Sequence, residues 1–168
     1  MIDSEQEKLN IFSEVREDLR KQEFRIVEED ASRPWGGFFV IDEDQAQQFA
    51  DTYFNGTAVD ELKISGKLSP KILVVAPNKR LSWQYHHRRA EIWQVIKGKV
   101  GVITSPVDEE GELKSYSPGE RITLKQGERH RLIGLDDWGI VAEIWQHTDF
   151  SLPSDESDII RVQDDFGR

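Results

Sequence analysis

Seven short β-rich runs follow one another along the chain from Pro70 onward. Turn-forming Gly, Pro, Asn and Asp residues separate them, and we place them near residues 71–76, 81–86, 92–97, 99–104, 121–124, 129–133 and 139–146. Short strands at a spacing of roughly 8–12 residues are typical of a β-sandwich or barrel. No internal repeat, linker or low-complexity tract interrupts the series, so these runs predict one all-β domain.

The N-terminal part of the chain predicts a helix before the first strands. Residues 4–22 are rich in Glu, Lys, Arg and Leu, and Phe12, Val15 and Leu19 recur every three to four residues. This period predicts an amphipathic helix that packs on the domain or forms a dimer contact. Strands are expected at 24–27 and 37–41. We therefore divide the chain into a helical extension, residues 1–30, and a single β-domain, residues 31–168.

A second helix is predicted from about Glu43 to Phe54. Asp42 and Gln45 have the spacing of a capping box, and Asn55-Gly56 is a typical helix end. The apolar residues within this stretch lie on one helical face. We expect this helix to cover an open end of the barrel.

Composition narrows the classes of partner. The chain has 168 residues with a net charge of −10, which argues against nucleic acids and anionic membranes as partners. It contains no cysteine, which excludes disulfides and thiolate chemistry. The N-terminus is polar and no apolar run approaches the ~18 residues needed to span a bilayer. A soluble cytoplasmic protein is the default expectation.

Positive charge gathers in one stretch of this acidic chain. Between Lys79 and Lys99 there are six basic residues and one acidic residue, Glu91. Such a basic island beside a metal site would suit a small anion such as a sugar phosphate. A solvated strand face explains the same charges equally well.

Potential metal ligands lie inside this basic island. Gln84, His86 and Glu91 are close in sequence, and His130 follows in a turn-rich setting. Strand side chains alternate between faces, so Ser82, Gln84 and His86 point one way and His87 points the other. A short loop through residues 88–89 can return Glu91 to the same centre. The pattern predicts a metal site inside the barrel.

The spacing of these residues resembles the two cupin motifs. Gln84, His86, Glu91 and Gly98 match the first motif, and Gly119, Gly127 and His130 match the second. Lys125 and Gly134 stand where the second motif usually has Pro and Asn, which concerns turn geometry more than ligation. The resemblance implies a double-stranded β-helix, or jelly-roll barrel.

Among cupins, the run from Leu81 to Trp93 is similar to the type II mannose-6-phosphate isomerases. That family has Gln at the first ligand position, with Ser two residues before it, as at Gln84 and Ser82 here. The flanks agree at residues 33–36, 130–132, 158–161 and 164–168. The similarity spans about residues 33–168 and is less typical over 42–69. The Gly-rich sugar-nucleotide loop of the nucleotidyltransferase domain is absent from this sequence, so the isomerase part alone is matched.

The resemblance implies a metal-dependent aldose–ketose isomerase acting on mannose 6-phosphate or a related phosphate, such as a heptose phosphate. Its ligands would be Gln84, His86, Glu91 and His130. This set leaves open positions for substrate on one divalent ion, with Zn²⁺ as first choice and Fe, Mn, Ni or Co as alternatives. Catalytic roles fall to Arg89 and Glu91, and substrate binding to Ser82, Arg33 and Arg89. The general base is unassigned, with a metal-bound water or Glu91 as candidates. A homodimer is expected.

Two other functions stay open. A metal-containing cupin that binds a sugar without turnover would keep the same ligands. An Fe-dependent oxygenase is disfavoured because Gln84 replaces a histidine. For the remaining polar residues we expect packing or surface roles: His87 and His147 on an outward face or the surface, Arg131 and Arg161 in salt bridges, and Arg168 in solvent. The five tryptophans are expected in the core, with Trp93 able to touch a sugar ring.

Overall fold

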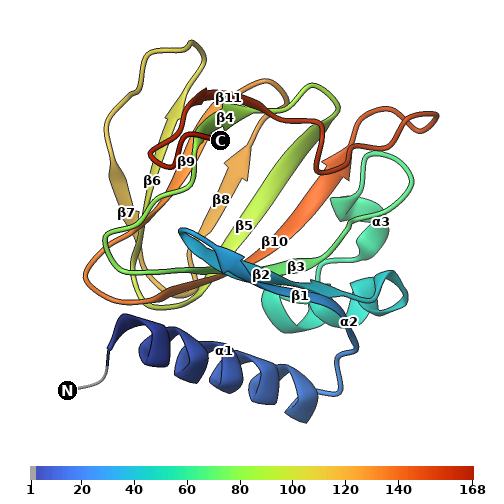
Figure 1. Ribbon diagram of the computed structural model, residues 1–168. Helices are drawn as coiled ribbons and strands as arrows, with labels where there is room; N and C mark the ends of the chain where they lie inside the picture. Colours follow the sequence, from blue (N-terminus) through green and yellow to red (C-terminus); the bar gives the residue numbers. More distant parts are fainter. Residues whose placement is uncertain (1–2) are drawn as a thin grey trace.

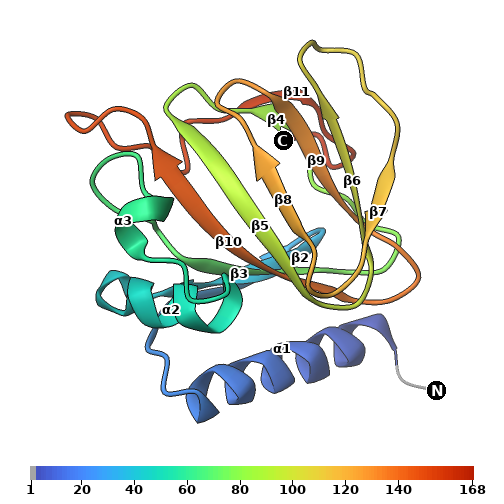
Figure 2. The same ribbon diagram turned by 180° about the vertical axis from the view of Figure 1, so that it is seen from behind.

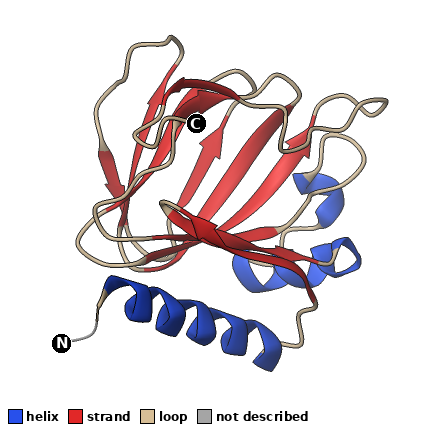
Figure 3. Ribbon diagram, in the orientation of Figure 1, coloured by secondary structure: helices blue, strands red, loops and turns tan. Residues whose placement is uncertain are grey.

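The computed structural model describes residues 3–168, which form two antiparallel β-sheets facing each other (Figure 1, Figure 3). The six-stranded sheet has the order β1-β2-β3-β10-β5-β8, and the five-stranded sheet has the order β11-β4-β9-β6-β7. The strands are β1 (Ile26–Arg33), β2 (Gly36–Ile41), β3 (Lys71–Val75), β4 (Trp83–Tyr85), β5 (Arg89–Lys97), β6 (Val100–Ser105), β7 (Lys114–Tyr116), β8 (Arg121–Leu124), β9 (Arg129–Gly134), β10 (Gly139–His147) and β11 (Ile160–Gln163).

The space between the sheets is an apolar core. It is formed by inward side chains of both sheets, including Leu73, Trp93 and Val95 from one and Val102 and Leu132 from the other. Alternate residues of the same strands, such as Ile72 and Val74, point to the opposite face and belong to a second buried cluster. The barrel predicted from strand spacing is therefore present, and the seven predicted strands are all found.

Helix α1 (Ser4–Lys21) lies against the outer face of the six-stranded sheet (Figure 1). The side chain of Asp3 accepts a hydrogen bond from the Gln6 amide at 2.8 Å and so caps the first turn. The predicted face, Phe12, Val15 and Leu19, is fully buried in the outer cluster. β1 follows within a few residues, runs through residue 30 and pairs with β2.

The second predicted helix is present as a 3₁₀ turn, η1 (Glu43–Gln45), followed by α2 (Ala46–Tyr53). Its apolar face packs in the outer cluster, so the helix covers the outside of the six-stranded sheet and not an open barrel end (Figure 2). The capping box is also absent. Asp42 accepts from the Asp44 amide, but the Gln45 side chain accepts from the Arg25 amide and donates to the Glu23 carbonyl.

Three elements were not predicted: β7, β11 and the short helix α3 (Val59–Leu62). The sequence of β11, Ile160-Arg161-Val162-Gln163, alternates apolar and polar residues over only four positions, and all four are exposed. β11 nevertheless pairs with β4, the strand that carries Gln84. Within residues 3–168, no helix has the length and apolar character required to cross a membrane.

Two glycines allow close backbone approaches near the motif positions. Gly98 closes the β5–β6 hairpin at a φ of 72°, and a Cβ there would lie 2.2 Å from the Trp138 carbonyl oxygen. Gly134 replaces the usual Asn, and a Cβ there would lie 1.9 Å from the carbonyl oxygen of Ala76. The departure at residue 134 thus fits the local packing.

Candidate functional site

Three of the four predicted ligands meet inside the barrel. β4 and β9 are neighbours with Gln84 paired directly opposite His130, and β5 carries Glu91 across from them. Ligand atoms of His86, Glu91 and His130 all lie within 4.8 Å of one another, and all three residues are buried. Glu91 Oε1 is 3.1 Å from His86 Nε2, and Glu91 Oε2 is 3.7 Å from His130 Nε2.

Gln84 is buried beside these residues and lines the same cavity as Glu91. Its Oε1 atom accepts a hydrogen bond of 3.3 Å from the Ser82 hydroxyl. Strand alternation is confirmed at this point, because Ser82 and Gln84 face the cavity while Trp83 belongs to an outer cluster. His87 is exposed, as predicted.

Both histidines turn the same nitrogen toward Glu91. Nδ1 of His86 is 2.7 Å from the Asp158 carbonyl oxygen, and Nδ1 of His130 is 3.1 Å from the Glu128 carbonyl oxygen. A carbonyl can only accept, so each Nδ1 carries the proton and each Nε2 offers its lone pair. Burial lowers the pKa of His130 to about 4, which keeps that ring neutral at neutral pH.

Arg89 is tied into the same cluster. Its Nε donates to Glu91 Oε1 at 2.8 Å, one terminal nitrogen is 3.2 Å from His86 Nε2, and the guanidinium stacks 3.6 Å from the Trp145 ring centroid. Burial opposes ionisation of Glu91, but the neighbouring positive charge of Arg89 outweighs it and holds the pKa of Glu91 well below its ordinary value. Glu91 is therefore an anion at neutral pH.

This donor set fits a divalent metal ion. Among residues 3–168, His130 Nε2 is buried without a hydrogen-bond partner, which is unusual unless a ligand completes it. Two neutral imidazole nitrogens, a carboxylate and an amide oxygen leave coordination positions open. Arg89 would give up its contact with His86 Nε2, since one lone pair cannot serve both partners. The carbonyls that hold the two Nδ1 atoms fix the rings in the orientation a metal requires.

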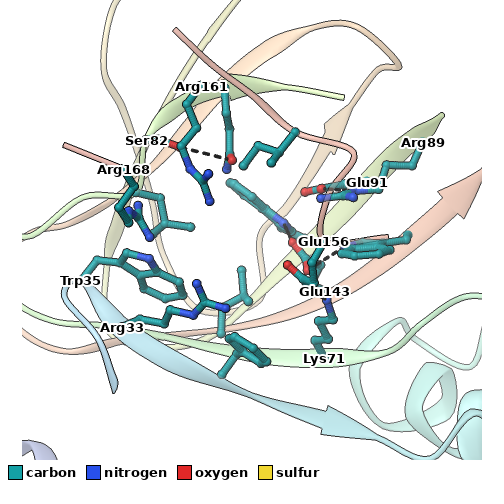
Figure 4. A pocket seen from close by; sticks show the side chains of 17 residues that line it. Arg33, Trp35, Lys71, Ser82, Arg89, Glu91, Glu143, Glu156, Arg161 and Arg168 are labelled. Atoms are coloured by element: carbon teal, nitrogen blue, oxygen red, sulfur yellow. Dashed lines mark hydrogen bonds and ion pairs between the residues drawn. The ribbon is translucent and has the colours of Figure 1, made fainter. Parts of the chain in front are cut away.

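A cavity opens beside the cluster between the two sheets (Figure 4). Three of the residues predicted to bind substrate, Ser82, Arg33 and Arg89, line it together with Glu91. The structure thus brings all of them to one place. Most of the basic residues between Lys79 and Lys99, by contrast, do not line this cavity. Of these six basic residues only Arg89 lines the cavity, while Arg80 pairs with Asp165 and Arg88 lies near Asp155 and Asp158.

Glu143 is a cavity residue that sequence reasoning missed. It comes from β10, lies opposite Trp93 in the β5–β10 pairing, and is 5% exposed. Its two carboxyl oxygens accept hydrogen bonds from the indole nitrogens of Trp93 at 2.7 Å and Trp145 at 2.9 Å. Burial, supported by the charge of Glu91, raises its pKa to about 8. A charged residue inside the apolar strand of residues 139–146 is the signal that could have found it.

Several residues outside the ligand set are placed differently from the expectation. His147 is buried, not on the surface: Nδ1 accepts from the Ser154 amide and Nε2 donates to Ser69. Arg168 pairs with Asp164. Arg161 makes no salt bridge with any residue of the described range 3–168 and lines the cavity. Arg131 is fully buried and structural, bonded to the Leu81 carbonyl and to Glu110. All five tryptophans are buried, as predicted.

The family assignment comes from a sequence model. The model of the mannose-6-phosphate isomerase C-terminal domain matches residues 42–164, which include every predicted metal ligand. The chain belongs to this family. The match contains the whole of the ligand cluster and also β11, while α1 and β1 lie before it.

Curated relatives of the chain are longer proteins of mannose metabolism. It is 25% identical over 150 residues to a mannose-1-phosphate guanylyltransferase of Salmonella montevideo, covering 89% of this chain and 26% of that protein. It is 28% identical over 142 residues to the enzyme of the same name from Escherichia coli strain K12, covering 84% and 24%. The chain thus spans about a quarter of the length of these relatives.

Solved structures with a similar fold belong to proteins with varied names. A mutant of Bacillus subtilis oxalate decarboxylase OxdC matches with a TM-score of 0.54 at 16% identity, covering 80% of this chain and 30% of that one. The capsular polysaccharide assembling protein CapF of Staphylococcus aureus matches with a TM-score of 0.52 at 16% identity, covering 83% and 34%. With the motifs and the facing sheets, these matches show a cupin barrel.

Proposed function

We propose that this protein is a metal-dependent aldose–ketose isomerase of a phosphorylated sugar, of the mannose 6-phosphate to fructose 6-phosphate type or a relative such as a heptose phosphate. The observation that carries the proposal is the buried Glu91 with the Nε2 atoms of His86 and His130 turned toward it, at a cavity also lined by Arg89 and Glu143. Membership of the family supports the substrate class.

Gln84, His86, Glu91 and His130 would hold the ion, with Zn²⁺ first and Fe, Mn, Ni or Co as alternatives. A divalent ion held there supplies Lewis-acid polarisation of the sugar carbonyl. Asp158 and Glu128 orient the two imidazoles through their carbonyl oxygens. These two contacts fix which nitrogen of each ring faces the cavity.

Glu143 fills the role of general base that the sequence leaves open. It takes the proton from C2 of the aldose and returns it to C1, while the hydroxyl proton passes from O2 to O1, so aldose and ketose contain the same atoms. The two indole N–H groups of Trp93 and Trp145 keep the carboxyl group in one orientation. A pKa near the working pH suits a group that must both accept and return a proton.

Arg89 supports the charge that develops on the substrate oxygens. Its guanidinium is buried and held by Glu91, Trp145 and the Ser154 hydroxyl, so it is already in place before substrate binds. A fixed cation in a buried site stabilises a developing oxyanion more than a mobile one in water. Arginine stays protonated, which leaves proton transfer to Glu143.

The test is isomerisation of a panel of sugar phosphates by metal-loaded protein, followed by NMR in D₂O. Turnover with deuterium incorporated at C1 or C2 is the expected result. No turnover on any member, with metal bound, would sink the proposal. Thermal stabilisation by a sugar phosphate without turnover would instead favour the second function, a metal-containing cupin that only binds its sugar.

A further inference from the structure

Three arginines from two distant parts of the chain line one side of the cavity. Arg33 ends β1, Arg161 lies on β11, and Arg168 is the last residue of the sequence. In Figure 4 they lie together with Ser82 on the side of the cavity away from Arg89 and Glu91. More than a hundred residues separate Arg33 from the other two, so only the fold places them together.

The position of Arg161 is set by strand pairing. Arg161 lies directly opposite Gln84 in the β4–β11 pair, and residues opposite each other in antiparallel strands share a face. Its guanidinium makes no hydrogen bond or salt bridge with the residues from 3 to 168. Partial desolvation and the neighbouring charges of Arg168 and Arg33 lower the pKa of Arg161, while Asp164 acts in the opposite direction. Like charges therefore face one another here.

The other two arginines are held in place but keep free donors. Arg33 uses only Nε, which donates to Asp30 at 3.1 Å. Arg168 uses Nε and one terminal nitrogen, which donate to Asp164 at 2.8 and 3.2 Å. Each guanidinium carries five N–H donors, so both retain donors for a further partner.

The charges lining the cavity leave an excess of positive charge. Its lining includes the five cations Arg33, Lys71, Arg89, Arg161 and Arg168, against the three carboxyl groups Glu91, Glu143 and Glu156. With all three carboxyl groups ionised the excess is two, and it sits on a chain whose net charge is −10. A phosphomonoester carries about −1.5 to −2 charges at pH 7 and therefore matches it. Arginine is also the side chain whose planar fork fits phosphate oxygens.

We propose that Arg161 and Arg168, together with Arg33, bind the phosphate group of the substrate on the side of the cavity away from Arg89 and Glu91. This inference rests on the proposed function and extends it to residues that sequence reasoning gave to structure or solvent. A phosphate held there directs the carbonyl end of the sugar toward Glu91 and Glu143.

The experiment is calorimetric titration of the full chain with mannose 6-phosphate and with inorganic phosphate. Arg161→Gln is expected to weaken binding of mannose 6-phosphate roughly 10- to 100-fold, as loss of a charged hydrogen bond implies. Arg25→Gln is the matched control, because Arg25 is exposed and pairs with Asp42 away from the cavity. It should bind both ligands as the wild type does.

Arg161→Lys keeps the charge without the fork, so its affinity should fall between those of the wild type and Arg161→Gln. It also provides the comparison if the glutamine variant does not fold. Equal affinity of wild type and Arg161→Gln would overturn the inference, as would no binding of either ligand to the wild type. Because binding is measured without turnover, arginine-dependent binding without isomerisation would contradict only the proposed isomerase. Isomerisation insensitive to Arg161 would contradict only the phosphate site.

Discussion

The Glu143→Gln variant should be less stable than the wild type at acidic pH and more stable than the wild type at alkaline pH. The pKa of Glu143 is raised by burial to about 8, against an ordinary value of 4.5. Between these values the unfolded chain has released this proton and the folded chain still holds it. The free energy of unfolding therefore falls as pH rises, by about 1.4 kcal/mol per pH unit. The whole interval is worth on the order of 5 kcal/mol.

Glutamine does not titrate, so the variant lacks this pH dependence, but the substitution lowers the free energy of unfolding by an amount that does not change with pH. Its carbonyl oxygen can accept from one indole N–H, but its amide group faces the other and leaves a buried donor unpaired. Such a donor costs about 1–3 kcal/mol. Near pH 5, only slightly above the ordinary pKa of 4.5, the wild type has lost little stability, so Glu143→Gln should be the less stable protein. Near pH 8 the wild type has lost more free energy of unfolding than the unpaired donor costs the variant, so the variant should be the more stable protein.

The assay is urea unfolding of chelator-treated protein at several pH values from 5 to 9. The difference in free energy of unfolding between the wild type and Glu143→Gln reports the titration of Glu143, because all other titratable groups are present in both proteins. Glu112→Gln is the control: Glu112 is exposed between β6 and β7 and makes no side-chain hydrogen bond or salt bridge within residues 3–168, so the difference from wild type should stay small and constant. A wild type and a Glu143→Gln variant whose difference does not change with pH would refute the reasoning.

The remaining predictions concern the ligand cluster. His130→Ala and His86→Ala should each weaken metal binding more than about 100-fold, whereas His87→Ala should leave metal binding nearly intact. Elemental analysis after dialysis measures the metal content of each variant. Equal loss of metal in all three variants would contradict the assignment of His86 to the inner face and His87 to the outer face. Arg89→Ala should lower kcat by roughly 100- to 1,000-fold while metal content changes little, and a parallel loss of metal would assign Arg89 to ligand positioning. Asp158→Ala removes the acceptor of the His87 and Arg88 amides and should lower the free energy of unfolding in urea by roughly 2–4 kcal/mol; an unchanged midpoint would contradict this.

Local periodicity in the sequence predicts the barrel and the strand faces on which the proposed ligands lie. Strand alternation assigns Gln84 and His86 to the inner face and His87 to the outer face, and the structure agrees. The amphipathic period of α1 likewise identified its buried face. The homodimer and the cytoplasmic location stay predictions.

Which charged residues line the cavity depends on the tertiary structure. The basic island of residues 79–99 is compact in sequence, yet Arg89 alone reaches the cavity. The other arginines that line it come from β1, from β11 and from the last residue of the sequence. Glu143 comes from β10, a strand whose other residues are mostly apolar. Alternation assigns a side chain to one face of its own strand, whereas the facing residue depends on which strands pair. β11 shows this most clearly: its four residues do not reveal which strand they pair with, and pairing with β4 sets Arg161 beside Gln84.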